Sequence, residues 1–212
     1  HRVDRRQRQM CIRDRLKLLG VMTNDIRSVI VKLFDRLHNL RTISSMPPHK
    51  QVEKAEETLL VYAPLANRLG LWTLKNELEA LSLQILEPEA YQIISDRLAQ
   101  IHQEQEESFN SISAEIFLLL MDANIDVRNV KLVPESVYSV YLELLGKETS
   151  FRHVDRTMRL VILINDWPSC YQAMGHVHRL WRPISEDFDD YIAVPRDNLY
   201  QSLHTTVVYS GG

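Results

Sequence analysis

The sequence predicts an α+β protein in which an all-helical module precedes a smaller, partial mixed-sheet α/β module. Two observations support this prediction. Between residues 24 and 124, apolar residues recur three and four positions apart, as they do along one face of an α-helix. After Asn124 the pattern changes to short apolar runs separated by helical segments, which is typical of strands and helices built around a sheet. The change at Asn124 is the clearest domain boundary in the chain.

Each element follows from local features. Asp25 suits the positive end of the first helix, Gly70 marks the end of the second, and Pro168 fits the first turn of a later one. Helices are expected from residue 24 to a break at 44–50, from there to about 68, over 71–86, and, as one or two helices, from there to about 124. The second module is then expected to contain a strand at 126–132, a helix at 135–146, a strand at 158–165, a helix at 167–181 and strands at 190–194 and 204–210.

The composition narrows the class of protein. The chain has 212 residues, 45% of them hydrophobic, which is ordinary for one or two domains with real cores. A net charge of -3 gives no general attraction to nucleic acid or to an anionic membrane. Cys11 and Cys170 are too few and too far apart to predict a disulfide framework or a zinc site, so we expect a cytoplasmic protein. No apolar run approaches the roughly 20 residues that cross a bilayer, and we expect no membrane partner.

The start of the chain differs in kind from the rest of it. Residues 1–15 hold six arginines and lack the apolar period. The stretch MCIRDR is similar to translated adapter sequence, which favours a non-native origin over a nucleic-acid-binding arm. Residues 1–19 are therefore left as an unassigned basic tail, with no function attached to them.

A first polar cluster lies in VKLFDRLHNLRT, residues 31–42. Asp35 and Asn39 are four apart and so share one helix face, and Arg36 follows Asp35. A carboxylate and an amide placed in this way can hold a divalent cation or a phosphate ester. They more often make structural hydrogen bonds, and spacing alone favours that interpretation. His38 by itself is typical of a half-buried surface histidine.

A second cluster lies in EDFDDYIAVPRDNLYQSLHTT, which we expect to be a loop between strands. An aromatic face such as that of Tyr200 can stack on a base. Amides such as Asn198 and Gln201 can pair with a purine edge, and Arg196 can grip phosphate with two hydrogen bonds. His204 lies in the same stretch. The cluster suits a nucleotide pocket, although an ordinary hairpin loop would have a similar composition.

Three stretches, residues 25–42, 62–91 and 170–207, together and in this order resemble the RelA/SpoT family, the long enzymes that make and degrade the alarmone (p)ppGpp. The resemblance runs from about residue 20 to 212. It implies the end of an HD hydrolase domain at 20–66, a helical linker region at 67–122 and the first part of a nucleotidyltransferase-like synthetase domain at 123–212.

In that family, the HD domain removes the 3'-pyrophosphate from (p)ppGpp with manganese, and the synthetase moves pyrophosphate from ATP to the 3'-hydroxyl of GDP or GTP with magnesium. The resemblance implies that Asp35 is a metal ligand and that Asn39, beside Arg36, contacts nucleotide in the hydrolase site. It also implies that Tyr200 stacks on guanine. The same guanine-nucleotide loop would include Arg196, Asn198, Gln201 and His204. Ribosome and tRNA would be partners only through C-terminal domains outside this chain.

The chain departs from the family pattern at both sites. The family's other hydrolase ligands, a His and a His-Asp pair, are expected upstream of this chain, and one carboxylate cannot hold a catalytic manganese. Around Tyr138 the family has three basic residues for the ATP phosphates. Those positions hold Val133, Glu135 and Glu143 here. Because two glutamates repel a triphosphate, we expect poor transfer.

The magnesium site also departs from the pattern. The family aspartate expected five residues before Arg159 is replaced by Val154, and the adjacent Asp155 would point to the opposite face of a strand. Without a metal, the charge on the transferring group is not neutralised. A later family glutamate would lie beyond Gly212, and Leu199 replaces a glycine before the stacking tyrosine, which asks for a less compact turn.

Three functions are consistent with these observations to different degrees. We favour a protein of (p)ppGpp metabolism whose parent has a working hydrolase and whose degenerate synthetase fold still binds guanine nucleotide. The first alternative is an active GTP or GDP pyrophosphokinase, which the substituted positions weigh against. The second is a non-catalytic helical interaction module, which the guanine loop weighs against.

Overall fold

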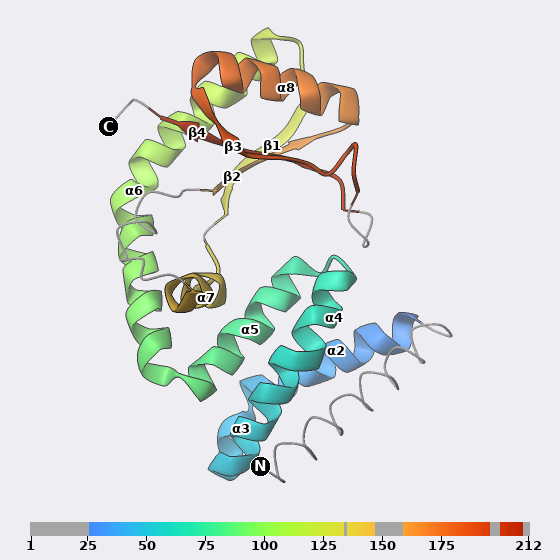
Figure 1. Cartoon of the computed structure of the whole chain (residues 1–212), viewed down its shortest axis with the longest axis vertical. Helices are drawn as coiled ribbons and strands as arrows, with labels where there is room; N and C mark the ends of the chain where they lie inside the picture. Colours follow the sequence, from blue (N-terminus) through green and yellow to red (C-terminus); the bar gives the residue numbers. More distant parts are fainter. Residues whose placement is uncertain (1–25, 134, 147–158, 196–199, 210–212) are drawn as a thin grey trace. The chain divides into compact units, whose positions relative to one another are not determined.

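The computed structural model describes residues 26–133, 135–146, 159–195 and 200–209, and Figure 1 shows the order of their helices and strands. The chain divides into two compact units by its internal contacts. One contains residues 1–96 and 136–148, and the other contains residues 97–135 and 149–212. The predicted fold class, a helical region followed by a small α/β portion, is confirmed.

The helical unit is built around α5 (Trp72–Leu86), on which α2 (Ile26–Arg41), α3 (Pro48–Glu57), α4 (Ala63–Arg68) and α7 (Val137–Gly146) pack. Its core joins α2, α4 and α5, and Leu33 and Leu78 are fully buried within it. The unit also contains the 3-10 turn η1 (Ile43–Ser45), the π-helical turn η2 (Thr58–Tyr62) and the start of α6 (Pro88–Asp122).

Residues in left-handed conformations end two of the helices. Gly70, with φ of 71°, follows α4 at the predicted place, where the missing Cβ removes the steric cost. The helical stretch predicted as one or two helices is the single α6 of 35 residues. Asn124, with φ of 57°, turns the chain from α6 toward the first strand. Among the described helices, none combines the length and the apolar character needed to cross a membrane.

In its described residues, the α/β unit has two strand pairs, the helix α8 (Trp167–Leu180) and the second part of α6. Strand β1 (Val127–Val133) pairs antiparallel with β2 (Arg159–Ile164), and β3 (Arg182–Asp190) pairs antiparallel with β4 (Leu203–Val208). These two antiparallel pairs are the sheets formed within the described residues. Helix α8 packs on β2, β3 and β4, and the Asp166 carboxylate caps it by accepting the Ser169 N–H at 2.9 Å. The core of this unit contains Ile116, Leu120, Ile125, Ala173, Val177 and Trp181.

The strand predicted at 190–194 is wrong. The strand lies upstream, as β3, and the chain turns immediately after Asp190. The Asp190 carboxylate causes this turn, because its Oδ1 accepts the backbone N–H groups of Ile192 at 3.0 Å and Ala193 at 2.8 Å. The pattern hid β3 because most of the strand is exposed and four of its nine residues are acidic, and acidic residues are depleted in strands.

Candidate functional site

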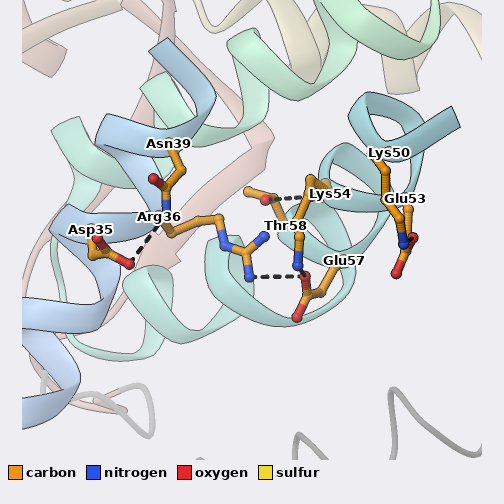
Figure 2. Close-up of polar contacts among 8 residues, drawn as sticks. All are labelled: Asp35, Arg36, Asn39, Lys50, Glu53, Lys54, Glu57 and Thr58. Carbon is orange, nitrogen blue, oxygen red and sulfur yellow. Dashed lines mark hydrogen bonds and ion pairs between the residues drawn. The ribbon is translucent and has the colours of Figure 1, made fainter. Parts of the chain in front are cut away.

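The first candidate site lies on the exposed face of α2. Asp35 and Asn39 are both exposed one turn apart, and Asn39 Nδ2 donates a hydrogen bond to Asp35 Oδ2 at 3.2 Å (Figure 2). His38 is exposed rather than half-buried. The opposite face of α2 is buried through Val29, Leu33, Leu37 and Leu40. Core packing on that face therefore decides that Asp35 and Asn39 are presented outward.

Arg36 points inward although it follows Asp35 in the sequence. It is 7% exposed, its Nη2 lies 2.8 Å from Glu57 Oε2, and its guanidinium lies 4.1 Å from the centre of the Tyr62 ring. Lys54 Nζ lies 3.1 Å from the same Glu57 oxygen (Figure 2). Sequence spacing indicated Asp35 and Asn39, but it gave no sign of Glu57 or Tyr62, which reach Arg36 from another helix.

The described residues do not fit a complete metal site. Asp35 is the one acidic residue of α2. Across the ranges that the structure describes, no group of three or more His, Cys, Asp and Glu side chains could hold a metal ion. Divalent cations in proteins need several such ligands, and a lone carboxylate does not hold a catalytic one.

The second candidate site lies between the turn after β3 and the start of β4. The Tyr200 hydroxyl and His204 Nε2 are 2.9 Å apart. The Tyr191 ring, which the sequence did not single out, lies with its centroid 6.0 Å from that of Tyr200 and 5.1 Å from that of His204. Gln201 is exposed beside them. The predicted residues Arg196, Asn198 and Leu199 lie outside the described residues.

Asp190 holds the base of this loop. The Tyr191 N–H donates a hydrogen bond to the Ser202 carbonyl at 2.9 Å, which closes the loop. Asp190 Oδ1 forms the turn, and Asp190 Oδ2 accepts a hydrogen bond from the Tyr171 hydroxyl at 2.8 Å. These donors to Asp190, the Ala193 N–H foremost, lower its pKa below the ordinary 3.8. The same carboxylate raises the pKa of Tyr171 above 10.0, because the hydroxyl donates to it. The loop therefore begins at a fixed anchor on α8.

A third cluster lies where β1 ends and β2 begins. Val133 is paired with Arg159 in the strand register, and Arg159 Nη2 lies 2.9 Å from Glu135 Oε1. The Arg159 side chain is 61% exposed and that of Glu135 is 19% exposed. Glu143 is exposed on α7. The substituted magnesium position, Val154, and its neighbour Asp155 lie outside the described residues.

Both halves of the chain match known protein families. A family model described as "HD domain" matches residues 2–72, and one described as "Region found in RelA / SpoT proteins" matches residues 134–212. The chain is 41% identical over 192 residues to the bifunctional (p)ppGpp synthase/hydrolase RelA of Mycobacterium tuberculosis, an alignment that covers 91% of this chain and 26% of that protein. The chain belongs to the RelA/SpoT family.

Two further members of the RelA/SpoT family are matched with similar coverage. The GTP pyrophosphokinase of Streptomyces coelicolor is 40% identical over 196 residues, covering 92% of this chain and 23% of that protein. The bifunctional (p)ppGpp synthase/hydrolase SpoT of Escherichia coli is 37% identical over 192 residues, covering 91% and 27%. The chain thus spans about a quarter of the length of these relatives.

Proposed function

We propose that this chain is part of a (p)ppGpp-metabolising protein whose α/β unit binds guanine nucleotide but transfers pyrophosphate from ATP poorly. The main support is the ion pair between Glu135 and Arg159 at 2.9 Å. By resemblance, Glu135 stands where the family has a basic residue for the ATP phosphates, and Arg159 matches a family arginine of the synthetase site.

The ion pair weakens ATP binding in two ways. A carboxylate and a phosphate compete for the same guanidinium donors, so Arg159 is already partly satisfied within the protein. The Glu135 charge also repels a triphosphate that approaches the end of β1. Val133 at the neighbouring position supplies no compensating positive charge. Arg159 is therefore expected to pair with Glu135 in preference to a nucleotide phosphate.

The guanine side has the chemistry for binding. Tyr200 offers an aromatic face for a base, and its hydroxyl is tied to His204 at 2.9 Å. A ring with fewer accessible orientations loses less entropy when a base stacks on it. The exposed amide of Gln201 can donate to and accept from a purine edge. Arg196 and Asn198 complete this proposed loop on the strength of the resemblance.

For the parent protein we propose hydrolysis of (p)ppGpp by the HD domain, with GDP, GTP and (p)ppGpp as ligands. The HD match at 2–72 and the outward Asp35 and Asn39 support it. Manganese there needs ligands from outside the described residues in addition to Asp35. We propose a reducing compartment, either the cytoplasm or a plastid, since an Arabidopsis thaliana relative is named as chloroplastic. Contacts with ribosome or tRNA would require C-terminal domains.

The experiment is an assay of the full-length parent protein with ATP, GDP and magnesium, alongside calorimetry with GDP alone. We expect GDP to bind and little (p)ppGpp to form. Robust (p)ppGpp formation would establish the alternative of an active pyrophosphokinase, which the names of several relatives favour. Absence of both GDP binding and synthesis would instead favour the non-catalytic interaction module.

A further inference from the structure

The helix that continues from α3 contains a π turn, η2, which contacts α2. Within it, the backbone N–H of Ala63 bonds to the carbonyl of Thr58, five residues back. Turns of this kind are rare, because they interrupt the more favourable α-helical hydrogen bonding, and they occur frequently at functional sites. The interruption therefore has to be compensated by some contact that a regular helix would not make.

The contact is visible around Arg36. Glu57 and Tyr62 are five residues apart, and on a regular α-helix they would point about 140° away from each other. The π turn instead brings residues five apart to the same side of the helix. As a result Glu57 Oε2 lies 2.8 Å from Arg36 Nη2, while the Tyr62 ring lies 4.1 Å from the same guanidinium.

This arrangement fixes the angle of α2 about its own axis. The Arg36 side chain is 9% exposed, so the guanidinium needs its carboxylate and its aromatic face to remain buried. Apolar side chains tolerate a small slip between helices, but a directional ion pair does not. Asp35 and Asn39 lie on the same helix, one position before and three positions after Arg36, so their direction is set when Arg36 is held.

We infer that Arg36 is a positioning residue, held by Glu57 and Tyr62, that fixes the direction in which α2 presents Asp35 and Asn39. The inference rests on the proposed hydrolase function and adds to it two residues, Glu57 and Tyr62, that lie outside the helix carrying Asp35 and Asn39. Arg36 is buried in the helical unit, and we assign it the role of orienting α2 rather than of contacting nucleotide.

The same helix supplies a matched control. Lys50 Nζ lies 2.7 Å from Glu53 Oε2, one turn before Glu57, and the two side chains are 50% and 38% exposed (Figure 2). Among the described residues, this ion pair joins two residues of α3 and does not link α3 to another helix. Glu53→Gln and Glu57→Gln therefore remove the same charge from the same helix, but only the second loosens the contact with α2.

The test uses the full-length parent protein and measures kcat and KM for hydrolysis of (p)ppGpp. We expect Glu57→Gln to lower kcat by about tenfold or more with a smaller change in KM, since misplacing a reacting group by about 1 Å can cost about 100-fold. Glu53→Gln should match wild type. Arg36→Lys should retain more activity than Arg36→Met, because it keeps the positive charge. Tyr62→Leu provides a variant with both charges intact if Glu57→Gln does not fold.

A second measurement, hydrogen exchange of the backbone amides of α2, separates the inference from the proposed function. Faster exchange in Glu57→Gln than in Glu53→Gln supports the role of Glu57 in holding Arg36 and α2, whether or not the wild type is a hydrolase. Equal exchange and equal kcat in the two variants would overturn the inference. A wild type that does not hydrolyse (p)ppGpp would overturn the proposed hydrolase function, and exchange alone would then decide the role of Arg36.

Discussion

The two candidate sites are assembled in different ways. On α2, Asp35 and Asn39 meet because they lie one turn apart on a single helix. In the α/β unit, Tyr191 belongs to the turn after β3, whereas His204 lies on β4 opposite Asp189. The residues of the first site would be neighbours in an isolated helix. In the second site, Tyr191 meets Tyr200 and His204 only because two strands pair and a turn closes.

This difference determines what each site depends on. The α2 site needs the helix to be held at the right angle, which the buried core and Arg36 provide. The site in the α/β unit needs the loop between β3 and β4 to be closed, and Asp190 and the antiparallel pairing of these two strands close it. A substitution that changes only the orientation of α2 should therefore affect the α2 site and spare the site in the α/β unit. A substitution that opens only the loop after β3 should do the reverse.

The largest expected effect comes from the core under α2. Leu33 lies two residues before Asp35 and is fully buried, and Leu33→Ala should lower the free energy of unfolding of the helical unit by about 2–5 kcal/mol, because it leaves a cavity. Urea unfolding of the full-length protein, combined with hydrogen exchange in α2 and in β4, measures it. Leu120→Ala is the matched change in the other core, where Leu120 is also fully buried. If both variants accelerate exchange in α2 equally, the two sites do not have separate supports.

Next in size is the loss of the stacking ring. Tyr200→Ala should weaken GDP binding by about 1–3 kcal/mol in calorimetry, the usual contribution of an aromatic side chain under a base. Tyr200→Phe keeps the ring and removes the hydroxyl that meets His204, so it should cost less. Unchanged GDP affinity in Tyr200→Ala would show that the ring is not the platform.

Most of the helical fold could be predicted from the sequence. Apolar spacing placed α2 and α5, and Gly70 marked the end of α4. Spacing also put Asp35 and Asn39 on one face, which the hydrogen bond between them confirms. All of these depend on neighbours within a few residues, where the geometry of a helix fixes the outcome.

Contacts made between separate elements could not be predicted in this way. Strand β3 was missed because its side chains are mostly exposed, and Tyr191 gained importance only through a turn caused by Asp190. The π turn leaves no mark in the apolar period, so the partners of Arg36 were invisible as well. The roles of the loop residues as nucleotide contacts remain predictions.

A smaller effect should result from releasing Arg159. Glu135→Gln removes the carboxylate that pairs with it, and we expect ATP to bind more tightly by about 1 kcal/mol or less, since partly exposed ion pairs are weak. Calorimetry with ATP at low and high salt measures the change, which should shrink at high salt. Glu143→Gln removes an equal charge from α7 and leaves the ion pair in place. Equal gains in both variants would show that general charge, rather than release of Arg159, limits ATP binding.

The smallest effect concerns the pH dependence of the closed loop. Because the pKa of Asp190 is lowered in the folded protein, its contribution to stability is present above its ordinary value of 3.8 and is lost as the pH falls through the folded pKa. Asp190→Asn keeps an oxygen for the Ile192 and Ala193 N–H groups but cannot be protonated in this range. We expect the variant to lose less stability than wild type on acidification, measured as urea midpoints between about pH 5 and pH 2.

Tyr171→Phe removes one donor to Asp190 and keeps both backbone donors, so its loss of stability on acidification should fall between those of wild type and Asp190→Asn. Identical acid dependence in all three proteins would mean that Asp190 does not hold the loop.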